Sequence, residues 1–273
     1  MISIEGFTGF FIFISGLIVG SFLNVCIVRL PQGKSIITPR SQCVHCHKTV
    51  PWYDNVPLLS YILLGGRCRF CKHRISFRYF IVELLTASLF LSFYHQYGLR
   101  IILLPYLVML CGLIVATFVD LQHRIIPDEV SVGGMVVGLI FSLLIPELHG
   151  AMGAEHHWIY SHLLSLGKSL LGVLVGGGTI YAMGLIGELL FRKEAMGGGD
   201  VKFLAMVGAF LGWKLALLTF FLAPFFGGIY GVIEKIRIKE SAIAYGPFLA
   251  MSTVISMFWG EEIIRFILRG YSF

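Results

Sequence analysis

The chain has 273 residues, of which 57% are hydrophobic and 13% are charged, and its mean hydropathy is +0.84. Soluble domains usually carry about 25% charged residues, so this composition excludes two large water-soluble domains and indicates an integral membrane protein. The net charge of +6 would suggest nucleic-acid binding in a soluble protein, but basic loops set the orientation of membrane proteins, and we expect no nucleic-acid partner.

The apolar stretches lack a strict alternation of apolar and polar residues, so we expect membrane helices and not a transmembrane barrel. A bilayer core about 30 Å thick needs about 20 helical residues, which leaves room for about eight spans and one small extramembrane module. The first span is predicted within residues 7–28. It lacks a basic start and a clear cleavage site, so we interpret it as a retained span and not as a signal peptide.

Residues 29–78 differ sharply from their surroundings, with nine Lys or Arg, four Cys, four Pro and one Asp. The cysteines form two C-x-x-C pairs, Cys43 with Cys46 and Cys68 with Cys71, separated by 21 residues. Two such pairs supply the tetrahedral sulfur shell of a structural zinc site. The separation slightly exceeds the usual zinc-ribbon range of about 15 to 20 residues.

Two disulfides are the alternative use of these cysteines. A module on the basic, cytoplasmic side would meet reducing thiols, which favours the metal. Three nearby histidines could replace one cysteine ligand, although each alone is better explained as a surface residue: His45, His47 and His73. Four ligands without an evident fifth group predict a closed, structural Zn²⁺ site.

Seven further spans follow, at roughly 79–96, 101–119, 130–146, 168–191, 201–213, 215–234 and 243–268. The sixth and seventh spans of the chain are separated only by Gly212, Trp213 and Lys214, so they could form a broken or re-entrant element. The Gly-rich stretch 172–187 predicts close helix packing. Phosphate binding is the weaker alternative there, because no Lys-Ser/Thr pair follows.

The predicted fold is therefore an all-α polytopic membrane protein of about eight helices. It has a first span (1–28), a cytoplasmic zinc module with four cysteines (29–78) and a seven-helix membrane domain (79–273). Counting Lys and Arg on alternate sides of the spans gives sixteen on one side and five on the other. The positive-inside rule then places the module and the loops 120–129 and 192–202 in the cytoplasm.

Two acidic residues stand at the ends of predicted spans. Asp120 closes the third span, and Asp200 opens the sixth after a run of three glycines. An ionisable group at membrane depth is costly and is a functional candidate. Both lie at cytoplasmic ends, so folding of the bundle could bring them together. The structural alternatives are a pair between Asp120 and Arg124 and a helix cap at Asp200.

Other acids favour structural interpretations. Asp128 and Glu129 follow Pro127 and look like an ordinary helix start. Glu83 lies near a span end, where packing or a salt bridge explains it as well as a functional role does.

If Asp120 and Asp200 meet, their chemistry is specific. Two adjacent carboxylates cannot both ionise easily, so they share a proton near neutral pH. The ionised partner can take a proton from water that attacks an amide carbonyl, while the protonated one polarises that carbonyl. This is aspartic protease chemistry, and the glycines before Asp200 would give an extended substrate room.

A set of motifs in order along nearly the whole chain resembles the bacterial type IV prepilin peptidases: Gly20–Val25, Cys43–Cys46, Pro51–Pro57, Cys68–Cys71, Ile75–Tyr79, Asp120 with Ile126–Asp128, Gly197–Lys202 and Tyr245–Phe248. The resemblance implies cytoplasmic-side cleavage of the basic leader of prepilins or pseudopilins, for a type IV pilus or type II secretion, in the bacterial inner membrane. It assigns Asp120 and Asp200 as the catalytic pair.

The resemblance also implies N-methylation of the new terminus with S-adenosylmethionine. No glycine fingerprint of a Rossmann nucleotide site appears in the sequence. We assign methyl-donor binding to Asp54 and Asn55, with a turn between two prolines as the alternative.

Two other classes of function compete with this interpretation. In an ion- or proton-coupled transporter, Asp120, Asp200 and Lys202 would form an ion path, but the acids lie at span ends and not at the midplane, and the zinc module has no purpose. In a membrane-anchored zinc adaptor, the acids would be incidental.

Overall fold

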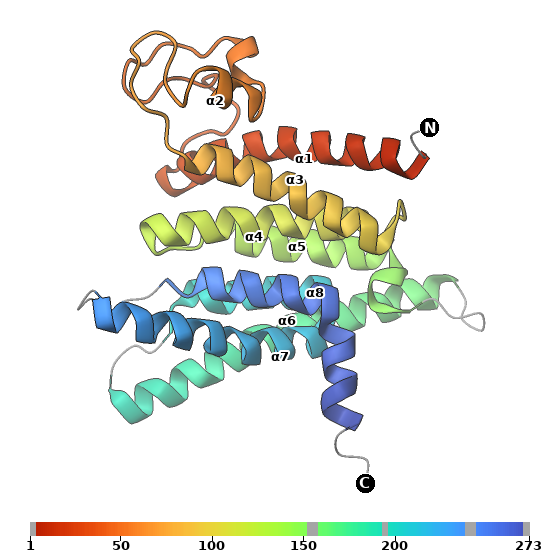
Figure 1. Cartoon of the computed structure of the whole chain (residues 1–273). Helices are drawn as coiled ribbons and strands as arrows, with labels where there is room; N and C mark the ends of the chain where they lie inside the picture. Colours follow the sequence, from red (N-terminus) through yellow and green to blue (C-terminus); the bar gives the residue numbers. More distant parts are fainter. Residues whose placement is uncertain (1–3, 152–157, 193–195, 238–243, 270–273) are drawn as a thin grey trace. The chain divides into compact units, whose positions relative to one another are not determined.

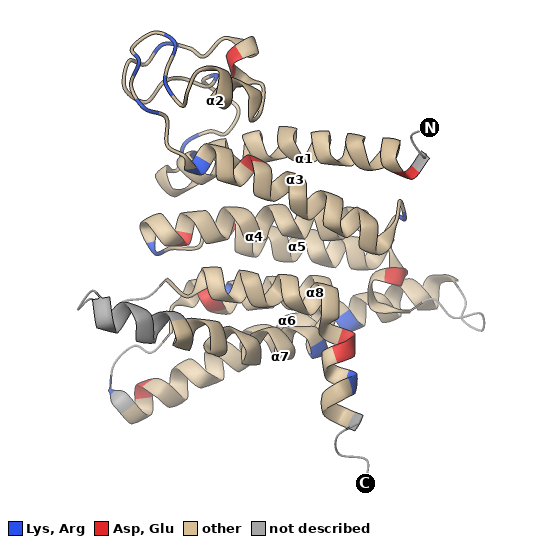
Figure 2. Ribbon diagram, viewed as in Figure 1, with Lys and Arg blue, Asp and Glu red and all other residues tan. Residues whose placement is uncertain are grey.

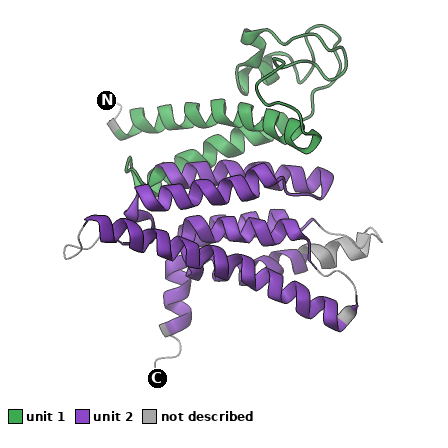
Figure 3. Ribbon diagram, turned by 180° about the vertical axis from the view of Figure 1, so that it is seen from behind, with its two compact units in different colours: residues 1–103 green, residues 104–273 purple. Residues whose placement is uncertain are grey.

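The computed structural model describes residues 4–151, 158–192, 196–237 and 244–269. These residues are largely α-helical, and two isolated β-bridges are the only extended pairings among them. The chain splits into two compact units, Met1–Leu103 and Leu104–Phe273 (Figure 3). The helix that follows the cysteine module, which the sequence assigns to the membrane domain, packs on the first helix.

Unit 1 is a pair of helices that carries the cysteine module (Figure 1). Helix α1 (Ile4–Arg29) packs against α3 (Arg78–Tyr97), and the module between them contains η1 (Leu30–Gln32), η2 (Trp52–Asn55) and α2 (Leu59–Leu63). The Asn24 side-chain amide donates to the Tyr79 carbonyl at 3.0 Å, which ties α1 to the start of α3. Lys and Arg are spread along the loops of the module (Figure 2).

Unit 2 is a helical bundle. It consists of α4 (Leu103–His123), α5 (Asp128–Leu144), η3 (Pro146–His149), α6 (Trp158–Phe191), α7 (Gly198–Arg237) and α8 (Gly246–Arg269). Helix α7 packs on α5, α6 and α8, and its residues 203–212 are all buried. It therefore forms the core of the unit.

Close packing of α6 on α7 explains the Gly-rich stretch. A Cβ on Gly172 would collide with the carbonyl oxygen of Gly208, and a Cβ on Gly208 would collide with the carbonyl oxygen of Gly172. Backbone contact of this kind is typical of helix pairs in lipid. The packing interpretation of this stretch is confirmed.

The predicted break between the sixth and seventh spans is confirmed at Gly212. This residue has φ 76° and ψ 173° inside α7, which joins the two predicted spans into one interrupted element. Only glycine adopts such a backbone readily.

Four helical segments are long and apolar enough to cross a membrane: Glu5–Gln32, Leu103–His123, Trp158–Leu190 and Gly198–Ile229. The described residues thus fit an all-helical, multi-pass chain, as expected. Helices α3, α5 and α8 coincide with other predicted spans but do not meet this criterion.

Candidate active site

Asp120 lies in the last turn of α4, and its side chain is buried. The backbone N–H of Gly246, the first residue of α8, donates to Asp120 Oδ2 at 2.9 Å. A Cβ on residue 246 would lie 2.8 Å from that same oxygen. Glycine is therefore needed where α8 begins, and this contact fixes the orientation of the carboxyl group.

Asp200 lies in the first turn of α7, and its own N–H donates to the Gly197 carbonyl at 3.1 Å. Its carboxylate and that of Asp120 are near enough to repel each other electrostatically. The loop after α4 reaches the same place, because a Cβ on Gly199 would contact Ile126 at 3.4 Å. The structure thus brings Asp120 and Asp200 to one end of unit 2, a point that the sequence left open.

The neighbouring acid has a structural role. Asp128 begins α5 and accepts from Lys202 Nζ at 2.7 and 2.9 Å, and both side chains are exposed. This ion pair ties the start of α5 to the start of α7. The helix-start interpretation of Asp128 is confirmed, and Lys202 is engaged by this carboxylate.

Tyr245 belongs to one of the motifs that carry the resemblance, but the sequence assigned it no role at this site. Its hydroxyl oxygen is buried and has no hydrogen-bond partner among the residues that the structure describes. It lies within electrostatic reach of Asp200 and directly precedes the glycine that contacts Asp120. A buried hydroxyl without a partner is costly, so this group is available to a ligand of the site.

The cysteine module of unit 1 forms a second site. The sulfur atoms of Cys43, Cys46, Cys68 and Cys71 all lie within 4.8 Å of one another, and Cys43 Sγ and Cys71 Sγ are 3.8 Å apart. All six cysteines of the chain are described, and none is disulfide-bonded. The cluster contains no histidine. The predicted set of four sulfur ligands therefore meets at one point.

The two cysteine pairs have the same local form. In each, the N–H of the first cysteine donates to the carbonyl of the residue five positions on, Cys43 to Lys48 at 3.0 Å and Cys68 to His73 at 2.9 Å. In each, the residue after the second cysteine has a positive φ, 54° at His47 and 58° at Lys72. The turns aim both sulfurs of a pair in one direction.

The thiols of the cluster differ in acidity: the neighbouring thiols raise the pKa of Cys71 to about 11, against the opposing effect of the His73 N–H, whereas backbone amides favour the thiolate of Cys68. The N–H groups of Cys71 and Phe70 lower the pKa of the Cys68 thiol to about 7, against the opposing effect of burial. Thiolate is the form that binds a metal. The donor set and its geometry fit a tetrahedral divalent ion.

The residues predicted to bind the methyl donor, Asp54 and Asn55, lie in η2. Asp54 accepts two hydrogen bonds from the Arg69 guanidinium, at 2.6 Å and 2.5 Å, and the Arg69 side chain holds the pKa of Asp54 below its ordinary value. Asp54 is thus committed to an ion pair. Asn55 is exposed and lines two cavities of unit 1.

Two family models match the chain. Residues 14–97 match the Bacterial Peptidase A24 N-terminal domain, and residues 107–232 match the Type IV leader peptidase family. The two matches divide the chain at nearly the same point as the two compact units.

Curated relatives agree with these matches. A protein of Myxococcus xanthus named prepilin leader peptidase/N-methyltransferase is 39% identical over 82% of this chain, and the match spans 62% of that protein. Proteins of the same name from Pseudomonas aeruginosa and Bacillus subtilis are 33% and 32% identical. Those two matches each cover 94% of this chain, and 92% and 97% of the relatives.

No solved structure matches this chain. The two family models and the relatives, which match over most of this chain, agree with the family that the motifs indicate. The chain therefore belongs to the type IV leader peptidase family.

Proposed function

We propose that this chain is a membrane aspartic endopeptidase that cleaves the basic leader of type IV prepilins or pseudopilins and N-methylates the new N-terminus. The observation that carries the proteolytic half is the convergence of Asp120 and Asp200, from α4 and α7, at one end of unit 2. The names of the relatives carry the substrate class and the methylation.

In the proposed mechanism the two carboxyl groups share one proton. The ionised group takes a proton from a water molecule as its oxygen bonds to the scissile carbonyl carbon, and the protonated group donates to the carbonyl oxygen. The tetrahedral intermediate collapses when the C–N bond breaks and the amine gains a proton. The leader then carries the new carboxylate, and the mature protein carries the new amine.

Two groups near the pair support this step. The Gly246 N–H donates to Oδ2 of Asp120. In the proposal, Oδ1 contacts the attacking water or the scissile carbonyl. The Tyr245 hydroxyl is a donor without a partner among the described residues. It can stabilise the negative charge that develops on the carbonyl oxygen.

The four-cysteine cluster is the proposed site of a structural Zn²⁺ ion, held by Cys43, Cys46, Cys68 and Cys71. When bound, the metal stabilises the fold of the module. Few regular elements lie between residues 30 and 77, and a small module of this kind depends on its metal.

S-adenosylmethionine is the proposed methyl donor, and it supplies a methyl group on a positively charged sulfonium. Its site is expected apart from the acids of unit 2, because an aspartic pair that shares a proton offers no reason to bind it.

The proposed setting is the bacterial inner membrane with about eight spans and the active site on the cytoplasmic side. The excess of Lys and Arg in the corresponding loops supports this orientation. The acids near the active end would meet the basic leader, so we expect substrate binding to weaken as salt rises.

Cleavage by purified protein in liposomes tests the proteolytic half. Asp120→Asn and Asp200→Asn should each abolish cleavage of a synthetic prepilin, whereas Asp128→Asn, which removes only the exposed pair with Lys202, should retain most activity. The transporter would be established instead by two results in the same vesicles. The wild type would show proton or ion flux without cleavage, and Asp120→Asn would lose that flux.

A further inference from the structure

Residues 51–66 of unit 1, which contain η2 and α2, form an apolar segment that exposes many large side chains. Trp52 is 84% exposed and Leu63 is 83% exposed. Asp54 is the one charged residue of the segment, and it is paired with Arg69. Extensive exposed apolar patches mark contacts with another protein or with a membrane. The exposed apolar side chains are those of Trp52, Tyr53, Val56, Leu59, Ile62 and Leu63.

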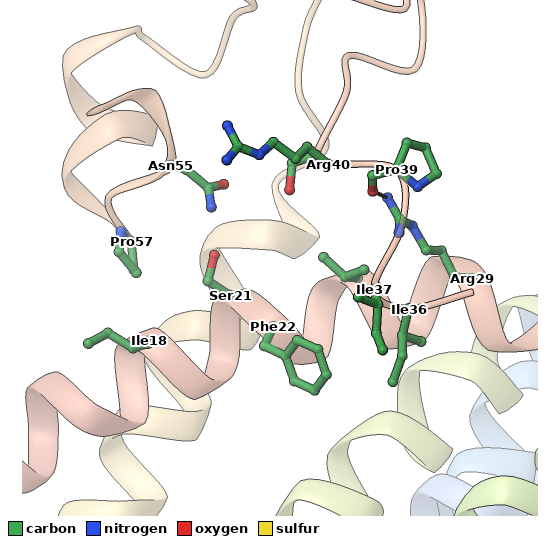
Figure 4. A pocket seen from close by; sticks show the side chains of 12 residues that line it. Ile18, Ser21, Phe22, Arg29, Ile36, Ile37, Pro39, Arg40, Asn55 and Pro57 are labelled. Carbon is green, nitrogen blue, oxygen red and sulfur yellow. Dashed lines mark hydrogen bonds between the residues drawn. The ribbon is translucent and has the colours of Figure 1, made fainter. Parts of the chain in front are cut away.

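The apolar segment lies beside α1 well inside its membrane-spanning stretch. Helix α1 has no charged residue between Glu5 and Arg29, so Arg29 marks the end of that stretch. A cavity of about 380 Å³ is lined by Ile18 of α1 and by Pro57. Figure 4 shows Pro57 across this space from Ile18. At about 1.5 Å per residue, Ile18 lies about 16 Å along the helix from Arg29.

A hydrogen bond fixes the segment at a similar level. The Leu58 N–H donates to Glu83 Oε2 at 2.8 Å, and the Ser21 hydroxyl donates to the same carboxylate. A Cβ on Gly20 would lie 2.8 Å from the Glu83 Cα, so α1 and α3 cross closely here. Ser21 lies about 12 Å along α1 from Arg29. The start of α2 at Leu59 is therefore held beside the span and not beyond its end.

These lengths place the segment among acyl chains. The bilayer core is about 30 Å thick, and the headgroup regions add about 5 to 8 Å on each side. Even if Arg29 lies at the outer edge of a headgroup region, contacts about 12 to 16 Å from it along α1 lie below the headgroups. A solvated module would not expose Trp52 and Leu63 at that depth.

Basic residues surround the apolar segment in the sequence, and they follow the loops of the module (Figure 2). Lipid phosphates attract Lys and Arg, and Trp and Tyr are favoured where acyl chains meet headgroups. An apolar stretch with aromatic residues between basic loops is typical of elements that lie in the membrane interface. The basic residues nearest to the segment are Arg40, Lys48, Arg67, Arg69, Lys72, Arg74 and Arg78.

We infer that the apolar segment inserts into the acyl chains of the leaflet at the Arg29 end of α1. The cysteine module then lies on the membrane beside α1, with its Lys and Arg at the lipid phosphates, and is not free in water. The proposed orientation names this leaflet as the cytoplasmic one. The inference is otherwise independent of cleavage and methylation.

The fluorescence of Trp52 in liposomes tests this placement without any substrate. The other tryptophans, Trp158, Trp213 and Trp259, are exposed, so Phe at these three positions leaves Trp52 as the one reporter. Interfacial elements reach about 5–10 Å into the headgroup and acyl boundary. Lipids brominated near the headgroup end of the acyl chain should therefore quench Trp52 more than lipids brominated at the chain end. Iodide in the water should quench it weakly.

Val44 provides the matched control in the same module. It is exposed as well, but it lies between Cys43 and Cys46 in a loop that contains histidines and Lys48. Val44→Trp, with Phe at all four natural tryptophan positions, should be quenched by iodide and not by brominated lipid.

Three results would overturn the inference. Quenching of Trp52 by iodide and not by brominated lipid would place the segment in water. Protection of Trp52 from both quenchers would show that protein covers it, either unit 2 or a second copy of the chain. Equal lipid quenching at positions 52 and 44 would exclude insertion through the apolar segment in particular.

A second variant tests the apolar contact itself. Ile62→Asp with Leu63→Asp changes two exposed side chains of α2, and charge at this depth in the bilayer is costly. Lipid quenching of Trp52 should fall to the level of Val44→Trp, and iodide quenching should rise. The resistance of the module to protease in detergent should stay unchanged. Unchanged lipid quenching of Trp52 would contradict the inference.

These outcomes differ from a failure of the proposed function. Protein that shows the expected quenching but never cleaves a prepilin would refute the activity and keep the placement. Protein that cleaves and methylates but has Trp52 open to iodide would refute the placement and keep the activity.

Discussion

The two units build their sites in different ways. In unit 2, the helix ends hold two acids that are eighty positions apart, and a backbone N–H fixes one of them. In unit 1, short loops hold four sulfur atoms together, and a cavity lies beside them. Helix packing orients the acids, whereas the loops have little regular structure of their own and would be held together by the proposed metal. Substitutions in one unit should therefore separate cleavage from metal binding and methylation.

The largest expected separation comes from unit 2. Asp200→Asn removes a group that is proposed to exchange protons during cleavage, so leader cleavage should fall by at least about a hundredfold. Zinc content and donor binding should stay at wild-type levels, as measured by metal analysis and calorimetry. Loss of zinc in this variant would show that the units do not behave separately.

A substitution in unit 1 should have the opposite effect, with loss of zinc and a smaller effect on cleavage. Cys71→Ser removes one of the four proposed metal ligands, so we expect loss of bound zinc and a module that is rapidly cut by protease, because metal binding and folding are coupled. Methylation should be lost, and cleavage should fall by a smaller factor. If metal analysis of purified wild-type protein finds neither zinc nor another metal, this prediction is contradicted.

A smaller effect tests the contact that orients Asp120. Gly246→Ala places a methyl group 2.8 Å from Oδ2 in the present geometry, and overpacking of this kind costs about 1–3 kcal/mol. We expect roughly tenfold slower cleavage with unchanged zinc content. The matched control is Gly228→Ala, where no atom lies within 4 Å of the added group, and it should be neutral.

Tyr245→Phe removes only the hydroxyl group near Asp200. Because the oxygen has no partner among the described residues, stability should be unchanged or slightly higher. We expect the rate constant of cleavage to fall about tenfold while the KM stays the same, since the hydroxyl is proposed to act on the transition state. A change in KM alone would assign it to substrate binding.

The smallest effect concerns the Asp54–Arg69 pair. The pKa of Asp54 is lowered by Arg69, so the pair stabilises the module fully above pH of about 4, the ordinary value for Asp, and is lost as pH falls through the lowered pKa. The melting temperatures of wild type and Asp54→Asn should therefore differ by a constant amount between pH of about 5 and about 8. A difference that varies within that window would assign the titration to another group.

The sequence points to candidate functional residues more readily than to the groups that surround them. Asp120 and Asp200 were identified because charge is rare in apolar spans, and the four cysteines because their spacing is specific. Tyr245, Asn24 and Glu83 were not assigned roles, since their importance depends on partners that are distant along the chain. Asn24 gains its significance from the Tyr79 carbonyl, and Glu83 from the N–H of Leu58.

In the fold, too, features set by local sequence were predicted, whereas contacts between distant segments were not. The hydropathy pattern located each long helix and the break at Gly212, because both depend on local sequence. The association of α3 with α1 depends on which surfaces fit, and a single sequence does not contain that information in a readable form.

The most direct test of the account is an experimental structure of the enzyme with an uncleavable prepilin leader bound. The account predicts that carboxyl oxygens of both Asp120 and Asp200 lie within about 3.5 Å, hydrogen-bonding distance, of the scissile carbonyl or of a single water beside it. A complex in which the scissile bond contacts only one of the two acids, or neither, would contradict the shared-proton mechanism.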